Sequence, residues 1–593
     1  MKLERRRYGI FILAFLVALG TLSLAALNPT QVSSLKVEVD QAVSLATDGN
    51  VNSLTVNVMV PQEDAFQTVE SVDVSVPYDT VTDAYGNKMV RVVLSNPGAR
   101  AGFTVKTVLD VQRKTTASVP DLPVFSQPAG LIESGDPEII ALASGTVSGS
   151  KTDFEKAASV ADWVNTNIRY DLSYADVNLS AKTTLKNRAG VCDEFSALTI
   201  AMLRSLGFRA SYVVGYAYGR GYTVANDFVA HGWVEACSPS GSCYQIDPTW
   251  GEAGWLDASH VKFAVLPETY YVEATASAKG AGQLGITLNS VDTKITILNS
   301  EEKPLIGTRL SLLEDKVWNG YAVTRTDLSA DGCVYTKVRF GSCVGEQGKF
   351  LEEDKNETGV AFCGKKSVFM PYSIPDSLKG GTVYTCGLTS SPNGGETKTI
   401  ELTLEPDKKS SETVGLGVDR TAVKPGETVT AVSPGAQIFT SNGDYGTGSL
   451  AVIAPAKDFT VYAYANGQLA EQIVSVAENR PVEVTLTSPP NVSLGETANV
   501  TVGVKNIDTR ERGITIRLGN ETRSTVLAPG KSASYLFAFA PAGNGRTVQA
   551  FVETDGFSTS ASAPITVIVP NKNIFDQILE ALAGFLDGIF GVH

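Results

Sequence analysis

The sequence predicts a multidomain α+β protein, on three observations. The chain has 593 residues, which at about 150 residues per domain suggests about four domains. Strand-type alternation punctuated by Gly, Asn and Pro covers most of the length, whereas helical spacing of apolar residues is concentrated between about 136 and 210. Apolar stretches near both ends, at 8–27 and 574–592, are expected to form helices.

The first 29 residues are predicted to be a signal anchor or a signal peptide. A basic start, Met1–Arg7, precedes 20 uncharged residues from Tyr8 to Leu27, a length that spans a bilayer as a helix. The basic flank predicts that everything after this segment is exported. The alternative is cleavage, because Ser23-Leu24-Ala25 has the small-x-small pattern of a signal peptidase site. We therefore expect a single-pass cell-membrane protein with an extracellular bulk, or a secreted protein if the signal is cleaved.

The domains expected after this segment are mainly β modules. They are a β-sandwich over 30–130, a mixed α/β domain over 131–275, a disulfide-containing β-module over 276–405, a β-sandwich module over 412–487, an Ig-like β-sandwich module over 488–570 and an apolar amphipathic helix over 571–593. We expect the last helix to lie in a membrane–water interface or to self-associate. Docking onto one of the β-modules is the alternative.

The seven cysteines agree with an exported protein. Six are close neighbours in sequence and predict three local disulfides, namely Cys237–Cys243, Cys333–Cys343 and Cys363–Cys386. A zinc site made by the last four is an alternative that no His or Cys-x-x-Cys spacing supports. Cys192 is left over. Five Asn-x-Ser/Thr sequons are candidate glycosylation sites: Asn178, Asn356, Asn491, Asn499 and Asn520.

Charge and missing motifs limit the partners. Lys and Arg number 49 and Asp and Glu number 63, giving a net charge of −14, which argues against binding of nucleic acid. The sequence has no EF-hand loop, Walker motif or Gly-rich dinucleotide fingerprint, so we expect no cofactor and no metal. His260 has no carboxylate or cysteine at ligand spacing, which predicts a structural role.

Cys192 is expected in the first turn of a helix. Gly190 precedes this helix and Gly207 ends it, and apolar side chains follow helical spacing between them at Phe195, Leu198, Thr199, Met202 and Leu206. At such a helix start the unpaired N–H groups favour a thiolate, and the Cys192 N–H can stabilise an oxyanion. Asp193 and Glu194 oppose the thiolate, so we expect a neighbouring imidazole to supply most of the activation. An inert apolar cysteine is the alternative.

A β-hairpin is expected to bring His231 and Asp247 together. Its strands flank a Ser-Pro-Ser-Gly-Ser turn, and if Cys237 faces Cys243, paired residue numbers sum to 237 + 243 = 480. His231 and Asp247 are then diagonal neighbours on one face, about 7 Å apart at the backbone. A slip of one residue would move the carboxylate to the other face, and a bulge would alter the register. The alternative is a surface His and a turn-forming Asp-Pro.

These residues form a nucleophile–base–orienter set, and the motifs that contain them resemble the transglutaminase-like family. The motifs, in order, are Gly190-Val-Cys192-Asp-Glu-Phe-Ser-Ala-Leu, Arg204-x-x-Gly-Phe-Arg-Ala, Val213-Val-Gly-Tyr216, His231-Gly-Trp-Val-Glu235 and Asp247-Pro-Thr. The resemblance covers about 150–265 and implies a papain-like/transglutaminase-like α+β core over 131–275. It also implies Cys192 as nucleophile, His231 as general base and acid, and Asp247 as the residue that orients the imidazole.

The resemblance implies an enzyme without fixing one reaction, because the family includes protein cross-linkers, peptidases, amidases and inactive copies. We expect an extracytoplasmic, membrane-anchored thiol acyl-transfer enzyme, either a peptidase/amidase or a protein transglutaminase, acting on protein or peptide amides. The alternative is a cell-surface adhesion or scaffold protein whose transglutaminase-like domain is not catalytic. The sequence indicates neither the oligomeric state nor a second oxyanion donor.

Overall fold

A computed structural model describes the chain between residues 27 and 568. Gaps in this description fall at 149, 220–226, 318–319, 346–347, 350–351, 354–355, 376–377, 407–413, 456–457, 477–480, 490, 494–495, 509, 541–546 and 555–556. The chain divides into two compact units. The first unit contains the residues up to Asp136 together with Val164–Leu305, and the second contains Pro137–Trp163 together with the residues from Ile306 onward.

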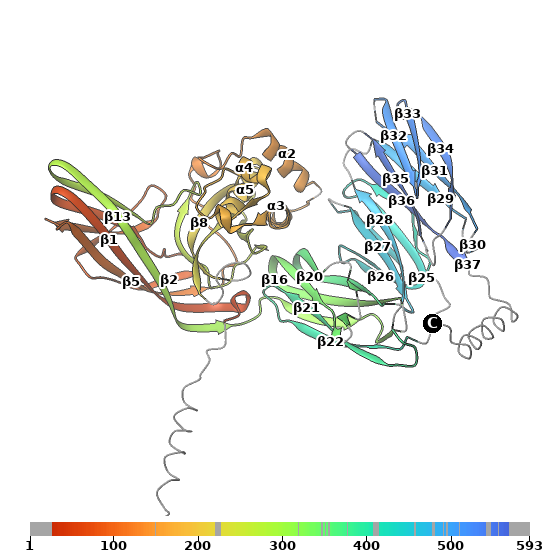
Figure 1. The fold of residues 1–593 in the computed structure, drawn as a ribbon, viewed down its shortest axis with the longest axis horizontal. Helices are drawn as coiled ribbons and strands as arrows, with labels where there is room; N and C mark the ends of the chain where they lie inside the picture. The colour runs from red at the N-terminus through yellow and green to blue at the C-terminus, as the bar shows by residue number, and fades with distance from the viewer. Residues whose placement is uncertain are drawn as a thin grey trace, which may run out of the picture. The chain divides into compact units, whose positions relative to one another are not determined.

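Strands dominate the described residues (Figure 1). Four α-helices occur among them: α2 (Pro137–Thr146), α3 (Asp153–Asn167), α4 (Ala181–Asn187) and α5 (Cys192–Ser205). The predicted α+β class is therefore wrong, and the protein is mostly β. The helices expected from apolar spacing do form, as α3 and α5, but the helical pattern is confined to one short stretch while Val- and Thr-rich alternation continues on both sides of it.

The expected membrane helix is also corrected. No helix among the described residues is long and apolar enough to cross a membrane, which contradicts the predicted single-pass location at the cell membrane. The longest of them, α3, has 15 residues, whereas a span needs about 20. Residues 1–26 of the expected signal segment and the whole expected C-terminal helix over 571–593 lie outside the described residues.

The first unit opens with a six-stranded antiparallel sheet in the order β2-β5-β1-β4-β3, with β13 paired to β1. Its strands are β1 (Val32–Met59), β2 (Gln67–Val74), β3 (Tyr78–Thr82), β4 (Lys88–Ser95), β5 (Arg100–Gln112) and β13 (Ala274–Glu302). β1 and β13 run side by side over nearly their whole length (Figure 1). Alternate residues of β1 are buried, which is the period of two that a one-sided sheet requires.

The second sheet of this unit carries the candidate site. Its order is β12-β8-β9-β10-β11, and its strands are β8 (Arg209–Tyr218), β9 (Phe228–Cys237), β10 (Cys243–Asp247), β11 (Glu252–Ala253) and β12 (Val261–Leu266). α5 packs on β8 and β9. Most of the residues of this sheet are buried, including the polar side chains His231, Glu235, Gln245 and Asp247, so buried and exposed residues do not alternate along its strands.

The two sheets of the first unit share a core, and this fixes the loop that precedes β12. Val32, Leu35, Val37 and Val39 of β1 form one buried cluster with Ala258, Val261 and Phe263. Short elements complete the unit: η1 (Pro29–Gln31), η2 (Pro123–Phe125), η3 (Leu172–Tyr174), and the parallel pair β6 (Arg169–Tyr170) and β7 (Ala189–Gly190).

The second unit is built from antiparallel β-modules. The first contains β14 (Gly307–Leu312), β15 (Lys316–Val317), β16 (Tyr321–Gly341), β17 (Val344–Gly345), β18 (Gly348–Lys349), β19 (Glu352–Glu353), β20 (Glu357–Ser373), β21 (Tyr384–Pro392) and β22 (Lys398–Leu404). The next contains β23 (Gly417–Val418), β24 (Ala422–Val423), β25 (Thr428–Thr440), β26 (Tyr445–Ile453), β27 (Phe459–Ala465) and β28 (Gln468–Val476). The last contains β29 (Val482–Thr487), β30 (Asn491–Ser493), β31 (Ala498–Asn506), β32 (Arg512–Leu518), β33 (Glu521–Leu527), β34 (Ser532–Phe539), β35 (Thr547–Thr554), β36 (Phe557–Pro564) and β37 (Thr566–Ile568).

All six paired cysteines expected from the sequence are bonded, but only one pair is the predicted one. Cys237 is bonded to Cys243 as expected. The pairs Cys333–Cys343 and Cys363–Cys386 were wrongly predicted, because Cys333 is bonded to Cys363 and Cys343 to Cys386. The antiparallel register of β16 and β20 places Cys333 directly opposite Cys363, so spatial pairing overrides proximity in sequence.

Candidate active site

Cys192 is the first residue of α5, as the sequence predicts. The side chain of Glu194 caps the helix start, accepting the Val191 N–H at 2.9 Å and the Leu179 N–H at 3.0 Å. A Cβ atom at Gly190 would lie 2.4 Å from the Cβ of Glu194, so this capping carboxylate requires glycine there. The Cys192 N–H belongs to the first helical turn, where backbone donors have no acceptor within the helix. It is therefore a candidate donor to an oxyanion.

The thiol of Cys192 is half-buried and is the only cysteine among the described residues that is not in a disulfide. Burial raises the pKa of the Cys192 thiol well above its ordinary value, and the Asp193 carboxylate raises it further. The backbone N–H of Gly232 acts in the opposite direction. The expected thiolate is therefore not the resting form, because burial and one adjacent anion outweigh the helix start.

Asp193 is held in place from the neighbouring strand. The buried Tyr212 hydroxyl of β8 donates to Asp193 Oδ1 at 2.7 Å, and the Cys192 Sγ donates to the same oxygen at 3.5 Å. A Cβ atom at Gly232 would lie 2.3 Å from the Tyr212 hydroxyl oxygen, so glycine is needed where β9 passes this tyrosine. Sequence reasoning named neither Tyr212 nor Gly232 as part of the site. The glycine that directly follows His231 in the sequence could have indicated that another side chain packs closely against β9 at this point.

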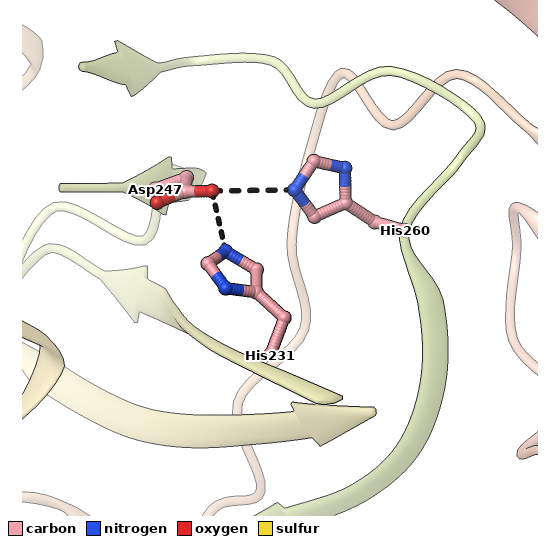
Figure 2. A group of neighbouring side chains, drawn as sticks. All are labelled: His231, Asp247 and His260. Carbon is pink, nitrogen blue, oxygen red and sulfur yellow. Dashed lines mark hydrogen bonds and ion pairs between the residues drawn. The ribbon is translucent and has the colours of Figure 1, made fainter. Parts of the chain in front are cut away.

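The β9–β10 hairpin has the predicted register. Cys243 pairs with Cys237, Gln245 with Glu235, and Ile246 with Val234. This register puts His231 and Asp247 on one face, and the His231 Nε2 lies 2.8 Å from the Asp247 Oδ2. His231 is 3% exposed and Asp247 is fully buried. The other ring nitrogen of His231 points away from the carboxylate (Figure 2).

Several further contacts fix the His231 ring and the Asp247 carboxylate. The His231 ring stacks on Trp250 with centroids 4.2 Å apart and an angle of 16° between the planes. Asp247 Oδ1 accepts the backbone N–H groups of Thr249 at 2.8 Å and Trp250 at 3.2 Å. The Asn165 side chain donates to the carbonyl oxygens of Pro248 and Thr249 at 2.9 and 3.0 Å, which holds this turn from a separate segment of the unit.

His260 is a second imidazole on the same carboxylate, which corrects the reason given for its structural role. Its Nε2 lies 3.3 Å from Asp247 Oδ2, and its Nδ1 lies 3.5 Å from Asp257 Oδ1 (Figure 2 for Asp247). Carboxylates do surround it: Asp257 precedes His260 by three residues in a tight turn and was visible in the sequence, whereas Asp247 comes from β10 and could not be placed by spacing alone. Burial disfavours the charged carboxylate of Asp247, yet the two imidazoles outweigh burial and hold its pKa well below the usual range.

Two groups of side chains are arranged closely enough to hold a metal ion, each with ligand atoms within 4.8 Å of one another. The first group is His231, Asp247 and His260, and the second is Glu252, Asp257 and His260. In the first group, the nitrogen of each histidine that would bind a cation already makes a hydrogen bond to Asp247. Hydrogen bonds of this length need a proton between the two atoms. We therefore assign the first group to holding protons rather than a metal.

Charged side chains are also buried beneath the hairpin. Glu235 Oε1 accepts the Gln245 amide at 2.9 Å and the Lys262 ammonium at 2.8 Å, and Lys262 also pairs with Asp64 at 3.0 Å. These contacts tie β9, β10 and β12 to the segment that follows β1. They support the register of the hairpin, because a buried charge is tolerated only where it is paired and a shift in register would separate these partners.

The five candidate glycosylation sites are exposed, namely Asn178, Asn356, Asn491, Asn499 and Asn520. Exposure permits modification but does not test it, and glycosylation of these residues stays a prediction.

Comparison with known proteins concerns mainly this part of the chain. Residues 140–248 match the model of the transglutaminase-like superfamily. An uncharacterized protein of Mycobacterium leprae (strain TN) is 31% identical over 94 residues, which is 15% of this chain and 33% of that protein. The chain thus spans about a third of the length of that curated relative.

Two solved structures were also similar in part. A candidate cysteine protease from Cytophaga hutchinsonii aligns over 46% of this chain and 93% of that chain, with 20% identity and a TM-score of 0.35. The Escherichia coli alpha-2-macroglobulin aligns over 88% of this chain and 53% of that chain, with 9% identity and a TM-score of 0.15. The family match covers the segment that holds Cys192, His231 and Asp247, and the chain is therefore a transglutaminase-like domain protein.

Proposed function

We propose that the domain is a thiol acyl-transfer enzyme that acts on protein or peptide amides through Cys192, His231 and Asp247. The observation that carries the proposal is the buried bond of 2.8 Å between His231 Nε2 and Asp247 Oδ2. It leaves the second ring nitrogen for a proton donor. The residue after His231 is Gly232, whose backbone N–H acts on the Cys192 sulfur, so the base and the nucleophile belong to one site.

The raised pKa of Cys192 favours activation during the reaction over a preformed ion pair. In the first step the thiol proton moves to His231 Nδ1 while the sulfur attacks the amide carbon. The Cys192 N–H then donates to the developing oxyanion. His231 returns the proton to the leaving amine, the C–N bond breaks and a thioester remains on Cys192. Water or a primary amine resolves the thioester, giving a peptidase/amidase or a protein transglutaminase respectively.

We further propose an extracytoplasmic setting for the reaction. Three disulfides are typical of an oxidising compartment, since cytosolic thiols are kept reduced. Cys192 remains outside these bonds, which a nucleophilic thiol requires.

A second candidate is a surface scaffold whose transglutaminase-like domain only binds. The observation that favours it is the Asp193 carboxylate beside the thiol, which together with burial raises the pKa of Cys192. An inert buried cysteine has this signature.

One experiment separates the two candidates. The protein is incubated with a peptide library, with and without a primary amine, and compared with Cys192→Ser. Products that depend on Cys192 support the enzyme: new peptide ends without amine indicate hydrolysis, and amine-linked peptides indicate transamidation. Library peptides that are retained but unchanged support the scaffold.

A further inference from the structure

His260 differs from His231 in what its two ring nitrogens face. Both imidazoles contact Asp247 Oδ2 through Nε2, at 2.8 Å from His231 and 3.3 Å from His260 (Figure 2). The His260 Nδ1 lies 3.3 Å from the carbonyl oxygen of Asp257 and 3.5 Å from its carboxylate. Among the described residues, no hydrogen-bond partner is present for the Nδ1 of His231.

This difference fixes the charge on His260. Both of its ring nitrogens face oxygen acceptors only, so a neutral imidazole would set a bare nitrogen lone pair against an oxygen lone pair. The ring is fully buried, and burial alone favours the neutral form. Asp257 and Asp247 outweigh burial and raise the pKa of His260 to about 9.

Resting on the proposed function, we propose that His260 is a positioning residue of the site, an imidazole that is protonated at neutral pH, holds Asp247 and weakens His231 as a base. Because both imidazoles donate to Asp247 Oδ2, the negative charge of this oxygen is shared between them and stabilises a proton on His231 less strongly. A neutral His231 is the form that can accept the Cys192 proton. A positive charge on the second imidazole favours that neutral form.

The other charged groups around His260 agree with this assignment. Asp257 lies on its own turn, Asp247 ends β10 and Glu252 comes from β11, with ligand atoms of Glu252, Asp257 and His260 within 4.8 Å of one another. Arg113 interacts electrostatically with Asp257 and Glu252, which offsets part of that negative charge. The Trp233 ring meets His260 edge-on at 5.2 Å and contributes no charge.

The charge on His260 can be tested without turnover. The chain has only three histidines, at 231, 260 and 593, so ¹⁵N-histidine NMR of the whole protein gives few signals, and a His593→Gln variant assigns one of them. We expect both His260 nitrogens to carry protons at pH 7 and the ring to lose a proton only near pH 9. A neutral His260 tautomer at pH 7 would overturn the proposal.

Two variants separate the charge from the hydrogen bond. His260→Gln keeps an N–H donor toward Asp247 without the charge, and His260→Phe removes both. The ring centroids of His231 and His260 are 5.9 Å apart, so loss of the cation should move the acidic limb of kcat/KM to higher pH by about one to two units. His260→Phe should also lower the plateau of kcat/KM about tenfold, because Asp247 loses a hydrogen bond.

Ser259→Ala is the matched control. It removes the hydroxyl hydrogen bond to Asp257 in the same turn without changing charge, and should leave the acidic limb of kcat/KM in place. If His260 is merely structural, His260→Gln will have a lower unfolding temperature but the same acidic limb of kcat/KM as the parent, and that result overturns the proposal. If the parent protein shows no turnover, the proposed function fails, whereas the NMR titration of His260 still decides the charge on this ring.

Discussion

The β9–β10 hairpin and the β16–β20 pair are both closed by a cross-strand disulfide, but the two bonds act on different things. Cys237 and Cys243 are six residues apart in sequence, and their register sets His231 beside Asp247. Cys333 and Cys363 are 30 residues apart and lie in a module that holds none of the three candidate catalytic residues. Loop-closure entropy predicts that the short loop contributes about 2 kcal/mol to stability and the long one about 4 kcal/mol.

A disulfide that contributes little to stability can therefore contribute much to function. The short disulfide has little chain entropy to remove, yet a slip of one residue in its hairpin would turn Asp247 to the other face of the sheet. The long disulfide restrains the unfolded chain more, but no chemistry depends on its register.

The largest effect is expected from removal of the nucleophile, which tests whether the hairpin serves catalysis at all. Cys192→Ser should lower turnover about 10³-fold or more, because the three residues act as a unit. The unfolding midpoint should stay close to that of the parent, since the change is nearly isosteric. Steady-state kinetics and thermal unfolding measure both. Activity within tenfold of the parent would show that Cys192 is not the nucleophile.

Removal of one disulfide should mainly lower stability, and removal of the other should mainly lower activity. Replacing Cys333 and Cys363 by Ser should cost about 4 kcal/mol of unfolding free energy and change kcat/KM less than twofold. Replacing Cys237 and Cys243 by Ser should cost only about 2 kcal/mol and lower kcat/KM at least tenfold.

Denaturant titrations and kinetics on the two double variants provide this test. Equal losses of activity in both variants would break the comparison, and a larger loss of activity in the β16–β20 variant would reverse it.

The same two regions mark how far the sequence could predict the structure. The β9–β10 register followed from placing Cys237 opposite Cys243 across a five-residue turn, because a tight hairpin leaves few alternatives. The partners of Cys333 and Cys343 could not be predicted, since they depend on how β16, β20 and β21 come together across long connections. The contact of His260 with Asp247 was missed for a similar reason, because Asp247 belongs to another strand and the burial of this region depends on the packing of β1 against the segment before β12. Asp257, three residues before His260, was visible in the sequence and was overlooked.

A third prediction concerns His260, the buried imidazole that contacts Asp247 of the hairpin. The pKa of His260 is raised from 6.5 to about 9, so its contribution to stability is complete below pH 6.5 and is lost as the pH rises to about 9. This shift corresponds to about 3 kcal/mol. Unfolding free energies measured between pH 6 and pH 9.5 should therefore fall more steeply for the parent than for His260→Gln. Parallel curves for the two proteins would contradict the assignment.

The smallest effect is expected beside the hairpin, at Lys114. Its ammonium group is fully buried and makes no hydrogen bond among the described residues, and burial lowers its pKa to about 8. An unpaired buried cation is costly, so Lys114→Met should raise the unfolding free energy at pH 7 by about 1–2 kcal/mol. Chemical denaturation measures the change, with the exposed Lys365→Met as the control. Destabilisation by Lys114→Met would show that the ammonium group supports the fold.

The central claim is that Cys192 carries the acyl group while His231 and Asp247 manage the proton. The most direct measurement is peptide mapping by mass spectrometry after the protein is mixed with peptide amides and quenched in acid. The account predicts an acyl adduct on Cys192 in the parent protein, its loss on adding a primary amine or on longer incubation in water, and its absence in His231→Ala. A parent protein that never acquires an acyl group on Cys192, while its peptides remain unchanged, would contradict the account.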